Sequence, residues 1–302
     1  MNFDIGEVLT RAWHITWRNK VLWAINVLPF LVTLLFFPVW FYFLFTKDLD
    51  PNRISRFMEN PVFVAVGVVT YFVILTVGIL LQVISRASVT LGAYRAATSA
   101  HPLAFMNLLR EGFKYFWRVL GVFALINGAL VVLFLIFFAC MILFSAVTMG
   151  LGALCFQPLF LLLIPLSVLV MAFLEQAESA IIADELGVMD AVKRAYELIR
   201  ANLGKYVLIT IVIYLGMSVL TSLLFFPVMI PMFFLMLRNM DANMGFSSMM
   251  RMEAVFGIVL FPIMALVQGF TLTYLKSAMM VTYLRLTRLS AMAQPEIEAA
   301  TA

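Results

Sequence analysis

The chain has 302 residues, of which 64% are hydrophobic and 12% are charged, with a formal net charge of +4. A soluble domain carries roughly twice that charged fraction. No soluble domain of this length could bury so much apolar surface, which excludes a cytosolic enzyme, a secreted disulfide scaffold and a disordered regulator. Long unbroken apolar runs also argue against an outer-membrane barrel, whose strands alternate. We therefore expect an all-α integral membrane protein.

Five long stretches lack Asp, Glu, Lys and Arg: Val21 to Thr46, Pro61 to Ser85, Val119 to Leu174, Tyr206 to Leu237, and Ala254 to Leu275. A helix that crosses the hydrocarbon needs about 20 apolar residues, so four of these runs predict one crossing each. The third run is too long for one helix, and a cluster of breakers interrupts it: Gly150, Gly152, Gln157 and Pro158. We split it at Val147 and Leu159 and expect six crossings. One crossing plus a re-entrant segment is the alternative.

The basic residues predict the orientation of these crossings. With six crossings, 15 of the 20 Lys and Arg residues fall on one side. The positive-inside rule then places both termini of this multi-pass protein in the cytoplasm. The two His and two Cys are too few and too scattered to predict a metal site, and we expect no cofactor.

A pattern recurs three times on the predicted cytoplasmic side. Segments starting at Ile5, Phe105 and Val188 each read apolar, any, acid or amide, apolar, apolar, polar, charged, small, aromatic. Apolar residues at three- and four-residue steps predict short amphipathic helices in the headgroup plane. Their aromatic anchors are Trp13, Trp17, Phe113, Trp117 and Tyr196. A membrane anchor is the favoured role, and docking of a partner is the alternative.

Each amphipathic segment leads into two predicted crossings. The sequence therefore predicts three repeated units in a single membrane domain, residues 1–290, with units of about 1–100, 101–183 and 184–290. Two crossings per unit keep the copies in one orientation, so a pseudo-threefold axis along the membrane normal can relate them. Residues 291–302 are expected to form a disordered tail.

The helices that leave the second crossing of each unit, here named the exit helices, also match. Arg86-Ala87-Ser88, Glu178-Ser179-Ala180 and Lys276-Ser277-Ala278 occupy the same place in the three units. Glu175 lies one turn before Glu178. Because an unpaired charge at the bilayer boundary is costly, we expect an inner ring of charge in which Glu178 pairs with Arg86 or Lys276. A structural pair is favoured, and a gate or a site for an anionic headgroup is the alternative.

Other motifs point to little chemistry. Met236, Met240 and Met244 are spaced by four, and thioethers favour Cu(I), but methionine is more often a flexible packing residue. No nucleotide-binding or catalytic motif is present, so we expect a protein that is not an enzyme. The predicted crossings carry scattered amides such as Asn26 rather than midplane charges, which favours hydrogen bonds between helices over ion-coupled transport.

The stretch from Ile181 to Leu203, together with Phe3 to Trp17, resembles uncharacterised bacterial six-helix membrane proteins. These are related to the membrane domain attached to some glycerophosphodiester phosphodiesterases. The resemblance covers nearly the whole chain and supports the fold, and it implies a location in the bacterial inner membrane. In that group catalysis belongs to a separate soluble domain, and no loop here is long enough to hold one.

These observations predict a non-enzymatic accessory protein of a membrane complex that binds lipid or a partner. Its expected partners are membrane lipid and other membrane subunits, not nucleic acid. The alternative is a permease or the membrane subunit of a transporter. A permease requires a polar cavity that reaches the midplane, whereas an accessory protein should have a filled, apolar bundle.

Overall fold

The computed structural model describes residues 4–32, 59–98, 103–240 and 262–287. The described residues form helices and turns and no strand. The elements are α1 (Ile5–Arg18), α2 (Lys20–Leu31), α5 (Pro61–Thr98), α6 (Phe105–Gly112), a 3₁₀ turn η2 (Phe113–Tyr115), α7 (Phe116–Val147), α8 (Leu151–Ala183), α9 (Val188–Ala201) and α10 (Leu203–Met240). A last helix covers residues 262–287.

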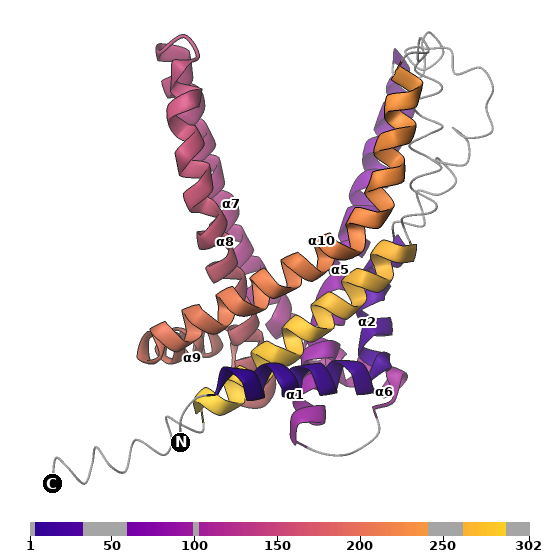
Figure 1. Ribbon diagram of the computed structural model, residues 1–302, viewed down its shortest axis with the longest axis vertical. Coiled ribbons are helices and arrows are strands. Elements are labelled where there is room, and N and C mark those ends of the chain that lie inside the picture. Colours follow the sequence, from indigo (N-terminus) through magenta and orange to yellow (C-terminus); the bar gives the residue numbers. More distant parts are fainter. Residues whose placement is uncertain (1–3, 33–58, 99–102, 241–261, 288–302) are drawn as a thin grey trace, which may run out of the picture.

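The helices form a base from which two arms diverge (Figure 1). One arm is the α7–α8 hairpin, and the other contains the outer parts of α5 and α10. The base contains α1, α6, α9 and the inner ends of the long helices. The 38 residues of α5 extend about 57 Å, far more than the roughly 30 Å of hydrocarbon, so this helix reaches from the arm into the base.

Within the described residues, four stretches are long and apolar enough to cross a membrane: Val64–Thr98, Phe105–Val147, Pro165–Ala183 and Leu203–Pro227. They indicate an integral membrane protein. The predicted first and sixth crossings fall partly on residues 33–58 and 241–261, which lie outside the described residues. The predicted tail, residues 291–302, also lies outside them.

A tight turn at Thr148–Gly150 joins α7 to α8. Gly150 has φ of 95°, a conformation that favours glycine and commonly ends helices. The long apolar run is therefore two helices, as expected, but the predicted boundary at Leu159 is wrong. Gly152, Gln157 and Pro158 lie inside α8. In lipid no water replaces lost backbone hydrogen bonds, so a helix persists through residues that would end it in a soluble protein.

The three amphipathic segments form helices that begin at the predicted residues Ile5, Phe105 and Val188. All three lie at the base end of the molecule (Figure 1). The fourth and eighth residues of each segment are buried: Val8 and Ala12, Leu108 and Gly112, Ala191 and Ala195. The second segment differs from the others because α6 ends after eight residues and continues through η2 into α7.

Each of these amphipathic helices packs on an exit helix. α6 packs on α5, and α9 packs on α8. α1 packs on helix 262–287, where Trp13 contacts Phe270 edge to face with 5.4 Å between ring centroids. One ion pair supports each contact: Arg95 with Glu111, Asp184 with Arg194, and Arg285 with Glu7. The first helix of the chain therefore packs against the last described one.

The contact between α6 and α5 depends on the absence of a side chain at Gly112. A Cβ there would lie 2.3 Å from Ser88 Oγ and 2.8 Å from Ser88 Cα. We predict that Gly112→Ala lowers the free energy of unfolding by about 1–3 kcal/mol, the usual cost of overpacking. Thermal unfolding in detergent measures this.

Gly128→Ala on α7 is the matched control, because nothing lies within 4 Å of the added Cβ. It should leave stability unchanged or raise it by up to about 1 kcal/mol, since alanine is the better helix former. Equal effects of the two substitutions would show that α6 does not pack closely on α5.

Candidate functional site

The three exit helices, α5, α8 and helix 262–287, converge in the base. The small residues that follow each charged position are fully or almost fully buried: Ala87 and Ser88, Ser179 and Ala180, Ser277 and Ala278. Small side chains let helix backbones approach closely. The charged residues that precede them are thereby brought into one place.

There Arg86, Glu175, Glu178 and Lys276 form a closed network of four ion pairs. Arg86 Nη2 lies 2.6 Å from Glu175 Oε1, and Arg86 Nε lies 2.7 Å from Glu178 Oε1. Lys276 Nζ lies 2.8 Å from Glu175 Oε2 and 2.6 Å from Glu178 Oε2. Each base contacts both acids, and all four carboxylate oxygens are used. The charge network is thus electrically neutral.

The charge network is buried. The side chains of Glu178 and Lys276 are 0% and 2% exposed, and that of Arg86 is 13% exposed. Lys276 Nζ also donates to Thr90 Oγ1 at 3.4 Å. The Arg86 guanidinium lies 5.5 Å from the centroid of the Phe123 ring on α7, which adds a cation–π contact. Charges removed from water require such complete partnering.

A second polar layer lies next to the charge network. Asn26 of α2 donates to Thr273 Oγ1 of helix 262–287 at 2.8 Å. Ser85, the neighbour of Arg86, donates to the Ile25 carbonyl at 2.8 Å. The interhelical hydrogen bonding expected for Asn26 is therefore present, and it joins α2 to two exit helices.

The other predicted site residues lie apart from the charge network. Trp13, Trp17, Phe113, Trp117 and Tyr196 are exposed on or next to the amphipathic helices. Met236 and Met240 belong to α10, but the structure describes neither their side chains nor Met244. Within the described part of the chain, no three His, Cys, Asp or Glu side chains are grouped to hold a metal ion.

Sequence reasoning identified the four charges but missed several neighbours. Phe123 gave no signal, because a phenylalanine in an apolar helix is an ordinary residue. The spacing contained one usable clue: Thr90 lies one turn after Arg86, on the same face of α5.

No protein-family model, curated protein or solved structure matches this chain. The chemistry of the site is therefore argued from its geometry. A neutral cluster whose members are mutually paired has no free acid or base to offer a substrate. It can hold helices together, and it separates only at a high energetic cost.

We predict that Glu178→Gln lowers the free energy of unfolding by about 3–5 kcal/mol, because Arg86 and Lys276 would then share one acid in a buried place. Glu178→Gln combined with Lys276→Gln should recover part of that loss, because the cluster becomes neutral again. Thermal unfolding of the two single variants and the double variant in detergent measures the coupling.

Glu197→Gln, at an exposed position on α9, controls for loss of an acid outside the charge network. It should change stability by less than about 0.5 kcal/mol. Simple additivity in the double variant would mean that Glu178 and Lys276 are not energetically paired.

Proposed function

We propose that this protein is a non-enzymatic accessory protein of a bacterial cytoplasmic membrane that binds lipid or another membrane subunit. In this proposal the chain crosses the bilayer six times, with both termini in the cytoplasm. The base forms a rigid cytoplasmic end, and the arms present apolar surface to lipid or to a partner.

The observation that carries the proposal is the contrast between base and arms. In the most apolar stretches of α5 and of the segment Phe105–Val147, which includes α7, no residue is fully buried within the described structure. Large apolar side chains are exposed along both, such as Val69 and Phe72 on α5 and Leu135 and Ile136 on α7. Every charged side chain of the charge network, by contrast, is paired internally. The exposed apolar surface that lipid or a partner could cover thus lies on the arms.

The contacts in the base support three repeated units. The exit helix of the first unit packs on the amphipathic helix of the second, and α8 of the second unit packs on α9 of the third. Helix 262–287 and α1 complete the series, as their ion pair and aromatic contacts show. A cyclic order of equivalent contacts is what a pseudo-threefold arrangement requires.

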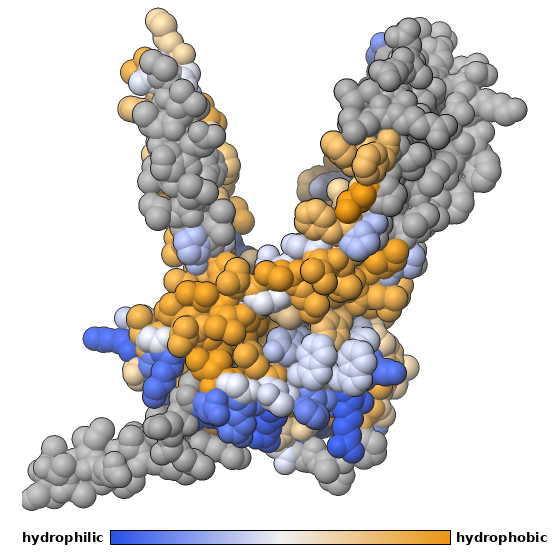
Figure 2. Space-filling view, viewed as in Figure 1, coloured by the Kyte–Doolittle hydropathy of each residue, from blue (hydrophilic) through white to orange (hydrophobic). Residues whose placement is uncertain are grey.

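A permease is the second candidate, and one observation favours it. The charge network joins α5 of one arm to α8 of the other at the base, while the space-filling view shows the arms separated above it (Figure 2). The described part of the chain is thus closed at one end and open at the other, and such an arrangement would expose a path to one side of the membrane.

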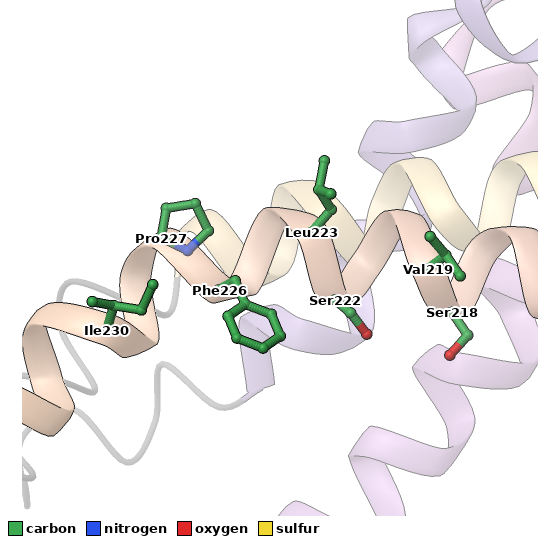
Figure 3. Close-up of a pocket in the computed structure, with 7 residues that line it drawn as sticks. All are labelled: Ser218, Val219, Ser222, Leu223, Phe226, Pro227 and Ile230. Carbon is green, nitrogen blue, oxygen red and sulfur yellow. The ribbon is translucent and has the colours of Figure 1, made fainter.

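The surface along α10 argues for lipid rather than water. A groove of about 480 Å³ is lined there by seven residues: Ser218, Val219, Ser222, Leu223, Phe226, Pro227 and Ile230 (Figure 3). Its polar groups are two serine hydroxyls, and it contains no charge. An apolar groove on a single spanning helix fits acyl chains better than an aqueous substrate path.

Cysteine labelling tests this proposal and its orientation together. In a background without Cys140 and Cys155, single cysteines replace Asp50, Met244, Ala201 and Ser222, and intact cells receive a membrane-impermeant maleimide. We expect Asp50→Cys and Met244→Cys to react from outside. Ala201→Cys should react only after permeabilisation, and Ser222→Cys in neither condition because lipid surrounds it.

Ser222 is exposed in the structure, so protein packing would not account for a lack of reaction. Reaction of Ser222→Cys would show water beside α10 within the membrane and would favour the permease. Reaction of Ala201→Cys from outside would overturn the orientation.

A further inference from the structure

The corner between α1 and α2 is a fixed structure at the surface of the base. α1 ends at Arg18 and α2 begins at Lys20, with Asn19 between them. The indole N–H of Trp23 on α2 donates to the Thr16 carbonyl of α1 at 2.9 Å, which ties the two helices together.

Aromatic rings form a platform beside this corner. Trp13 and Trp17 stack with 5.8 Å between centroids and 8° between planes. Trp23 and Phe270 each pack edge to face against Trp17, and they also pack edge to face against each other. Trp13 and Trp17 remain 45% and 56% exposed, and no partner of either indole N–H is present among the described residues. Half-exposed tryptophans with available donors are typical of the membrane interface.

The two cations at the corner lack acidic partners. Arg18 and Lys20 are exposed, and neither forms an ion pair within the described chain. Three acids of the base pair elsewhere: Glu7 with Arg285, Glu111 with Arg95, and Asp184 with Arg194. These three acids lie in the contacts between helices, while Arg18 and Lys20 face outward.

The equivalent corners of the other two units each have an acidic residue near a cation. At the second corner Arg118 donates to the main-chain carbonyl of Glu185 at 2.9 Å, so an acidic residue lies beside it. At the third, Glu197 lies on α9 three residues before Arg200. The first corner combines two exposed cations that form no ion pair within the described residues with two stacked, half-exposed tryptophans.

We propose that the α1–α2 corner binds an anionic phospholipid of the cytoplasmic leaflet, with Arg18 and Lys20 at the phosphate and Trp13 and Trp17 against the glycerol and upper acyl chain. Basic residues at the inner membrane surface attract anionic lipid. The exposed tryptophans favour a lipid over a free phosphate, because a lipid has apolar atoms that can pack against the indole rings and a phosphate has none. This proposal deepens the proposed function and rests on it, since it names one lipid class and its place.

Tryptophan quenching tests the site. The full chain in detergent is titrated with brominated phosphatidylglycerol and, separately, with brominated phosphatidylcholine. The part of the quenching that is lost in Trp17→Phe comes from Trp17 and therefore reports lipid bound at the corner. We expect phosphatidylglycerol to quench Trp17 at much lower concentration. Arg18→Gln with Lys20→Gln should reduce that preference roughly twenty-five-fold, because each interfacial cation contributes about a factor of five.

Arg110→Gln with Lys193→Gln removes the same charge from exposed sites on α6 and α9, and it should leave the preference unchanged. Arg18→Lys should retain most of it. Equal losses in the corner variant and the control variant would mean general surface attraction and would overturn the site. An absence of preference in the unsubstituted chain would also overturn it. If one of these two results were found while Ser222→Cys stayed unreactive, the lipid site at the corner would be wrong but the proposed function would still hold.

Discussion

The cost of a buried charge determines much of this structure. Two acids and two bases are held away from water where the exit helices meet, and such ions are tolerated only when they are paired and hydrogen-bonded. Four ion pairs between 2.6 and 2.8 Å meet that requirement. Because Arg86, the two glutamates and Lys276 belong to three different helices, neutralising the charges also fixes the helices relative to each other.

The division between base and arms follows from this constraint. In the base, polar and small residues pack three helices closely, and further polar contacts such as Asn26 with Thr273 bring in α2. Beyond the base no comparable polar contact holds α5 to the α7–α8 hairpin among the described residues. Lipid is as apolar as the arms, so no hydrophobic force drives them together. The arms can therefore diverge, as they do in Figure 1.

Much of this arrangement could be predicted because membranes impose simple rules. Charge-free runs locate apolar helices, and the start of each amphipathic helix at Ile5, Phe105 and Val188 follows from its repeated pattern. The pairing of Glu178 was expected from its matching place in the exit helices. The predicted helix boundary near Leu159 is wrong because it assumes that Pro158 ends a helix. Proline does so more often in soluble proteins than in lipid, and here Pro158 lies inside α8. The partnership of Arg86 with Phe123 depends on the tertiary approach of α7, which no local pattern encodes.

The central claim is that the charge network sets the position of the arms. Electron–electron double resonance measures it most directly, with one spin label on the exposed native Cys140 of α7 and a second on Val69→Cys of α5, after replacement of Cys155. We predict one narrow distance distribution in the otherwise unsubstituted chain and a broader, shifted one in Glu178→Gln, with Glu197→Gln unchanged. Identical distributions in all three proteins would show that the arms are positioned without the charge network.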